Sequence, residues 1–124
     1  MMAHNEPRTF GTYLRSIRQE RQLSLRQLAK AVEITPTYLS DLERGNNHPP
    51  DKTLLEKIIL ALELQHDEEC WQTLLDLAAK ERNDLPVDIK EYLMENPTLQ
   101  KLIRKVQNMP DSEQFFAQKL SELS

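Results

Sequence analysis

The sequence is poor in cysteine, glycine and aromatic residues: its 124 residues include one cysteine and two glycines, and 6% are aromatic. Because a single cysteine, Cys70, excludes an internal disulfide, we expect a reducing compartment. No apolar run approaches the roughly 18 to 20 residues that span a bilayer, and no signal-like segment opens the chain. The sequence therefore predicts a cytoplasmic protein without membrane contact.

Combinations of side chains that catalysis would require are also missing from the sequence. His4, His48 and His66 lack metal-ligand spacing, and no base is identifiable for Cys70. No glycine-rich loop that could hold a phosphate group is present. We therefore expect neither an enzyme nor a protein that binds a metal or cofactor.

Leu, Glu, Gln, Lys, Arg and Ala dominate the composition, which favours helices joined at proline-marked corners. The length fits one small domain with an extension. We therefore predict an all-α fold with a flexible arm at 1–9, a helical domain at 10–82 and a helical extension at 83–124. The net charge of −4 is uneven, since residues 1–50 carry +2, residues 51–83 carry −4 and residues 84–124 carry −2.

Residues 23–45 contain two short helices that meet across a brief turn. Ser24 and Gln27 have the spacing of a capping box, and Thr35 followed by Pro36 is typical of a helix start. Gly45 supplies a left-handed stop. Apolar periodicity extends the prediction to five helices in the domain: Phe10–Arg21, Leu25 to about Val32, Pro36–Arg44, about Asp51 to Leu62, and Asp67 to about Arg82.

Three further short helices are predicted beyond a hinge at Asn83–Pro86. The last begins at Asp111, where Gln114 has the spacing of a second capping box. Each helix is too short to be stable alone in water. The extension must therefore pack on the first domain or on a partner chain.

Three segments occur at a spacing typical of one family of proteins. They are the RQLAKAV run at 26–32, the ITPTYLSDLERG run at 34–45 and the NNHPP loop that follows them. With the five helices around them, residues 10–80 resemble the DNA-binding domain of the XRE family, which includes phage repressors and Cro. The resemblance implies a five-helix lambda-repressor-like fold, in which the third helix enters the major groove of double-stranded DNA as the recognition helix. Glu33 stands where this family commonly has glycine, which predicts a strained turn.

The same resemblance assigns two groups of contact residues. The candidates for base contact are Thr35, Thr37, Tyr38, Ser40 and Asp41. The candidates for phosphate contact are Arg18, Arg26, Arg44, Asn46, Asn47 and His48. It also implies a pair between Arg18 and Glu43 that would hold Arg18 toward the phosphates.

A single module of this kind makes few base contacts, so we expect a homodimer that binds a palindromic operator, with residues 84–124 as the candidate dimer element. Repression by occluding a promoter is what the family implies. One alternative is an antitoxin or mobile-element regulator whose C-terminal helices bind a protein partner. Another is a protein-interaction adaptor that binds no DNA and uses the helix-turn-helix only as a scaffold.

Overall fold

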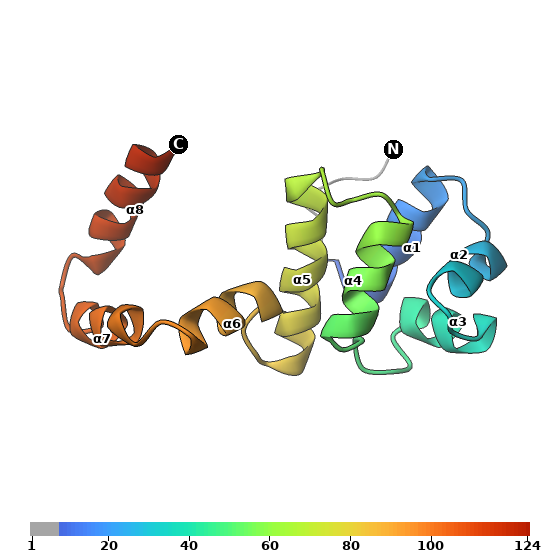
Figure 1. Ribbon diagram of the computed structural model, residues 1–124, viewed down its shortest axis with the longest axis horizontal. Coiled ribbons are helices and arrows are strands. Elements are labelled where there is room, and N and C mark those ends of the chain that lie inside the picture. The colour runs from blue at the N-terminus through green and yellow to red at the C-terminus, as the bar shows by residue number, and fades with distance from the viewer. Residues whose placement is uncertain (1–7) are drawn as a thin grey trace. The chain divides into compact units, whose positions relative to one another are not determined.

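All regular structure in the described residues, 8–124, is helical in the computed structural model (Figure 1). The eight helices are α1 Phe10–Glu20, α2 Leu25–Ala31, α3 Pro36–Arg44, α4 Lys52–Ala61, α5 Glu68–Arg82, α6 Val87–Met94, α7 Pro97–Val106 and α8 Ser112–Leu123. The predicted all-α fold, with a five-helix domain followed by a helical extension, is confirmed. Most of the predicted arm, residues 1–7, lies outside the described residues.

The chain divides into two compact units, and the boundary between them in the sequence lies between Asp88 and Ile89. In the first unit α1 packs on α3 and α5, while α2 packs on α3 and α4 (Figure 1). Apolar side chains from all five helices meet in one core. Its fully buried members include Phe10, Leu14, Leu28, Leu39, Leu42, Ile58, Leu62 and Leu74. This packing fixes α3 against α1 and α2 against α4.

The helix starts in this unit follow local sequence signals. Ser24 and Gln27 form the predicted capping box of α2, and the Thr35 hydroxyl accepts a hydrogen bond from the backbone N–H of Tyr38 at the start of α3. Asp51 caps α4 in the same way, by accepting from the N–H of Leu54 at 3.0 Å. The side chains thus satisfy backbone donors that a helix start leaves without intrahelical partners.

Gly11 lies where α1 closely approaches the backbone of α3. A Cβ atom at this position would lie 2.4 Å from the carbonyl oxygen of Leu42 and 2.5 Å from that of Glu43. Because both neighbours are backbone atoms of α3, no side-chain rotation could relieve the overlap. The absence of a side chain at Gly11 therefore sets how closely α3 lies against α1.

The last turn of α5 makes hydrogen bonds to two segments of this unit that are far away in the sequence. A carboxylate oxygen of Glu81 accepts a hydrogen bond from the backbone N–H of Phe10 at 2.5 Å, which places an acid at the start of α1. The guanidinium of Arg82 donates to the carbonyl oxygen of Pro49. The end of α5 therefore stabilises both the start of α1 and the loop that follows α3.

The second unit, residues 89–124, has very little core. Val106 is its one buried residue, whereas several large apolar side chains are about half exposed or more. They are Ile89, Tyr92, Met94, Leu102, Phe116, Leu120 and Leu123. Units below about 40 residues rarely fold without a further source of stability.

The predicted capping box at Asp111 is wrong. α8 does begin directly after Asp111, but neither Asp111 nor Gln114 makes a side-chain cap hydrogen bond. A capping residue typically has an extended backbone, as at Ser24 and Thr35, where ψ is 163° and 150°. Asp111 has φ −113° and ψ 29°, so its backbone has the wrong conformation for this bond.

Candidate nucleic-acid interface

The turn between α2 and α3 contains the strained residue that the sequence predicts. Glu33 has φ 63°, a left-handed conformation that favours glycine. Its carboxylate lies 3.0 Å from the Nζ of Lys57 on α4. An ion pair between residues far apart in the sequence therefore ties this turn to α4.

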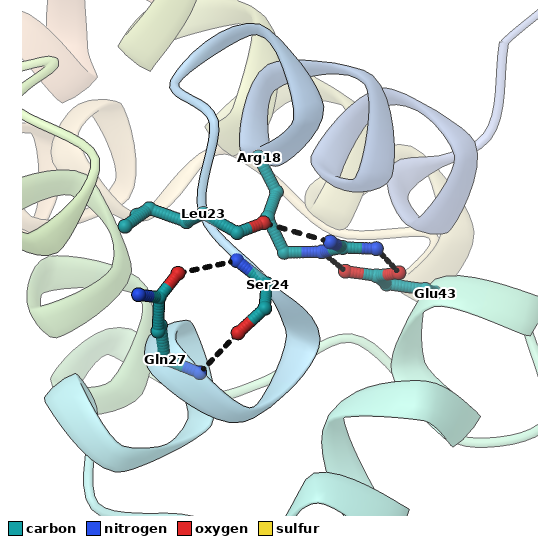
Figure 2. Close-up of polar contacts among 5 residues, drawn as sticks. All are labelled: Arg18, Leu23, Ser24, Gln27 and Glu43. Atoms are coloured by element: carbon teal, nitrogen blue, oxygen red, sulfur yellow. Dashed lines mark hydrogen bonds and ion pairs between the residues drawn. The ribbon is translucent and has the colours of Figure 1, made fainter.

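Arg18 and Glu43 form the predicted pair, which joins α1 to the end of α3 (Figure 2). The Arg18 Nε donates to one carboxylate oxygen at 2.7 Å and a terminal nitrogen donates to the other at 2.9 Å. The two side chains are only 11% and 5% exposed. The hydrogen bonds to Glu43 raise the pKa of Arg18 above its ordinary value, so Arg18 stays charged although it is buried.

A third hydrogen bond extends this pair toward α2. The other terminal nitrogen of Arg18 donates to the carbonyl oxygen of Leu23 at 2.9 Å, directly before the Ser24 cap (Figure 2). The Ser24 N–H in turn donates to the side chain of Gln27 at 2.7 Å. Arg18 therefore holds the end of α3 and the start of α2 in one arrangement.

The candidate base-contacting residues are distributed over two sides of α3. Thr35 and Thr37 are exposed, and Ser40 is half-buried. Tyr38 is also half-buried, and its ring packs against the edge of the core. Burial of part of this aromatic ring stabilises the fold.

Asp41 is half-buried as well and lies 3.8 Å from the guanidinium of Arg44, one turn further along α3. This ion pair is exposed at the arginine, whose side chain is 63% accessible. Such a pair contributes little to stability and leaves both groups able to rearrange.

The candidate phosphate-contacting residues fall into two classes. Five of them are exposed: Arg26, Arg44, Asn46, Asn47 and His48. Arg18, by contrast, is buried and directs its guanidinium to Glu43 and Leu23. Its geometry is that of a residue that positions α2 and α3.

Two hollows flank α3. The first, of about 450 Å³, is named here the Thr37 hollow and is lined by Ser24, Leu25, Arg26, Pro36, Thr37, Ser40 and Arg44. The second, of about 520 Å³, is named the Tyr38 hollow; its polar lining includes Tyr38, Asn47, His48, Thr53 and Lys57. The sequence interpretation missed Lys57, since only the folded chain brings α4 beside the turn.

The side chains of Tyr13 on α1 and Cys70 on α5 lie within hydrogen-bond reach of each other. Burial raises the pKa of Tyr13 and of Cys70 above their ordinary values, and a hydrogen bond between the two side chains contributes to the shift of Tyr13.

Within residues 8–124, no three His, Cys, Asp or Glu side chains gather as a metal site. Over the same range, no helix combines the length and apolar character needed to cross a bilayer.

Comparison with known proteins agrees with this geometry. A helix-turn-helix domain family matches residues 9–69. The HTH-type transcriptional regulator DdrOP3 of Deinococcus deserti is 54% identical over 41 residues, which are 33% of this chain and 32% of that protein. The ImmF control region 10 kDa protein of Bacillus phage phi105 is 40% identical over 50 residues, which are 40% of this chain and 56% of that protein. The matched part of the chain thus spans 32% and 56% of the length of these two relatives.

Two solved structures are also similar. The clp gene regulator ClgR from C. glutamicum has 35% identity and a TM-score of 0.48, over 60% of this chain and 94% of that one. The SinR/SinI protein complex gives 23% identity and a TM-score of 0.48, over 93% of this chain and 94% of that one.

The domain therefore contains a helix-turn-helix, formed by α2 and α3, and the predicted fold is confirmed. Residues 9–69 belong to the helix-turn-helix domain family, and the resemblance to helix-turn-helix regulators that the sequence predicts is confirmed.

Proposed function

We propose that this chain is a cytoplasmic transcriptional repressor that binds a palindromic operator in double-stranded DNA as a homodimer. The observation that carries the proposal is the fixed presentation of α3: Arg18 and Gly11 hold it against α1, while Thr37 and Arg44 remain exposed on its surface. A rigid helix with an accessible polar face can enter the major groove without reorganising first.

In this proposal the two sets of contacts differ in what they do. Thr35, Thr37, Tyr38, Ser40 and Asp41 contact base edges, where hydroxyl and carboxylate oxygens distinguish base pairs. The exposed polar groups at Arg26, Arg44, Asn46, Asn47 and His48 contact phosphates and set the register. Arg18 acts indirectly, because its donors already hold Glu43 and Leu23.

Dimerisation is assigned to the second unit. Residues 89–124 bury one side chain and expose many apolar ones, as expected of a small unit completed by another chain. Two copies would present their recognition helices to two half-sites about one helical turn, roughly 34 Å, apart.

The same exposed apolar side chains also favour a second candidate, an antitoxin or mobile-element regulator whose C-terminal helices bind a different protein. In that case the unit would co-purify with a stoichiometric partner and would not self-associate. An adaptor without DNA binding would retain the fold but show no preference among DNA sequences.

Selection of bound sequences from a random DNA pool tests the main proposal. We expect a palindromic consensus whose half-sites are separated by about 10 base pairs. Recovery of an asymmetric site would contradict dimeric binding, and failure to enrich any sequence would contradict specific DNA recognition and favour the adaptor.

A further inference from the structure

The Tyr38 hollow contains a charged group that the proposed contacts do not use. Three of its polar side chains, Tyr38, Asn47 and His48, are already candidates for DNA contact. Lys57 lies in the same hollow but on α4, and its side chain is 44% exposed. The hollow therefore brings a lysine next to residues that belong to the proposed interface.

Two of the other charged groups in this hollow have fixed partners. Asp51 accepts a hydrogen bond from the backbone N–H of Leu54 at 3.0 Å as the cap of α4. Arg82 donates to the carbonyl oxygen of Pro49. The charges able to move are thus Lys57 and Glu33, whose carboxylate is 3.0 Å from the lysine and whose side chain is 76% exposed.

The position of the hollow relative to α3 suggests what could occupy it. Thr37, Ser40 and Arg44 recur at helical spacing and line the Thr37 hollow, whereas Tyr38 faces the other hollow. A helix inserted in the major groove lies between two phosphate backbones, in a groove about 12 Å wide. A recognition helix flanked by a hollow on each side fits this arrangement.

We propose that the Tyr38 hollow receives a phosphate group of one DNA strand and that Lys57 is the cation that binds it. This inference rests on the proposed DNA-binding function and adds a contact to it. In the free protein Glu33 pairs with Lys57; on binding, the phosphate replaces the carboxylate and Glu33 turns to solvent. Glu33 therefore lowers the affinity for DNA, both by holding Lys57 and by repelling phosphate.

The test measures binding of the full chain to a fluorescein-labelled duplex that carries the selected site. Anisotropy titrations at 50 and 200 mM salt give the log–log slope of affinity against salt, whose magnitude decreases by about 0.9 when one phosphate interaction is removed. For Lys57→Met, the ratio of the affinities at the two salt concentrations should shrink by about threefold. Lys80→Met, which removes one exposed positive charge from α5, serves as the matched control and should leave the ratio unchanged.

A second variant acts in the opposite direction. Glu33→Gln keeps the size of the side chain but removes its charge, and it should strengthen binding at 50 mM salt by about two- to fivefold. Ethylation of the single phosphate that contacts Lys57 should weaken binding by the unmodified chain and have no effect on Lys57→Met.

Separate results overturn the inference and the proposed function. If the unmodified chain binds the duplex but Lys57→Met has the same salt slope, the hollow holds no phosphate and the DNA-binding proposal stands. Unchanged or weaker binding by Glu33→Gln would overturn the competing role of Glu33. No binding by the unmodified chain would overturn both proposals.

Discussion

Substitution of Glu43 by alanine should be among the most destabilising single changes to this domain. The carboxylate accepts two hydrogen bonds from Arg18, at 2.7 and 2.9 Å, and both side chains are almost completely buried. Glu43→Ala leaves the guanidinium of Arg18 in the protein with only the carbonyl oxygen of Leu23 as a partner. The loss of stability comes mainly from the unpaired positive charge of Arg18, and less from the lost attraction between Arg18 and Glu43.

Breaking a buried ion pair on one side typically costs about 3–5 kcal/mol in the free energy of unfolding, roughly a third or more of the total for many domains. At about 4–8 °C per kcal/mol for a domain of this size, even the lower value lowers the melting temperature by roughly 12–24 °C. Circular dichroism at 222 nm during heating measures this change.

Two variants make this prediction falsifiable. Glu56→Ala removes an exposed carboxylate on α4 that lies 3.7 Å from Lys52, and it should change stability by less than about 0.5 kcal/mol. The double variant Arg18→Met with Glu43→Leu replaces both charges by apolar groups and should recover most of the stability that Glu43→Ala removes. A decrease below about 1 kcal/mol for Glu43→Ala, or a double variant as unstable as Glu43→Ala, would refute the reasoning.

Four further predictions concern other parts of the chain. Gly11→Ala should lower the free energy of unfolding by about 2 kcal/mol or more, measured by urea denaturation, because its Cβ overlaps the backbone of α3. Thr37→Ala should change base preference in a pool selection, whereas Arg44→Ala should weaken binding to all sequences and flatten the salt slope. Cys70 should react more slowly with iodoacetamide in the folded chain than in urea, because burial raises the pKa of its thiol. Phe116→Asp should shift the sedimentation of the full chain from dimer toward monomer, because this exposed ring belongs to the apolar surface of the second unit.

The elevated pKa of Cys70 also gives a direction for the pH dependence of stability. The unfolded chain releases the thiol proton at a lower pH than the folded chain does. The neutral, buried thiol of Cys70 therefore contributes fully to stability below about pH 8.5. This contribution is lost as the pH rises through the pKa of Cys70 in the folded chain. Urea denaturation at pH 7 and pH 9 measures it.

Each prediction has an opposing outcome. Unchanged stability of Gly11→Ala would show that α1 and α3 can separate without cost. Altered base preference in Arg44→Ala, with an unchanged salt slope, would exchange the proposed roles of phosphate and base contacts. Equal alkylation rates in folded and unfolded chains would contradict burial of Cys70. A Phe116→Asp variant as dimeric as the unmodified chain would move the dimer interface elsewhere.

Features governed by neighbouring residues were predictable from the sequence. The Ser24 and Thr35 caps, the left-handed Gly45 and the limits of α3 follow from side chains within four residues of the position concerned. The left-handed conformation of Glu33 was predicted from the family pattern and is confirmed. Such signals suffice for the helices and for the order in which they occur.

Features that depend on the folded chain were not predictable in the same way. Gly11 gives no local signal, because its role arises from backbone atoms of α3 more than 30 residues away. The contact of Glu33 with Lys57 and that of Arg82 with Pro49 likewise join separate elements. The packing of the Tyr38 ring against the edge of the core is also a contact between separate elements.

The central claim is that α3 recognises a particular DNA sequence. Its most direct test compares binding of the full chain to the selected duplex and to a scrambled duplex of the same composition, at one physiological salt concentration. Specific recognition predicts an affinity at least about 10³-fold higher for the selected duplex. Equal affinity for the two duplexes would contradict the claim.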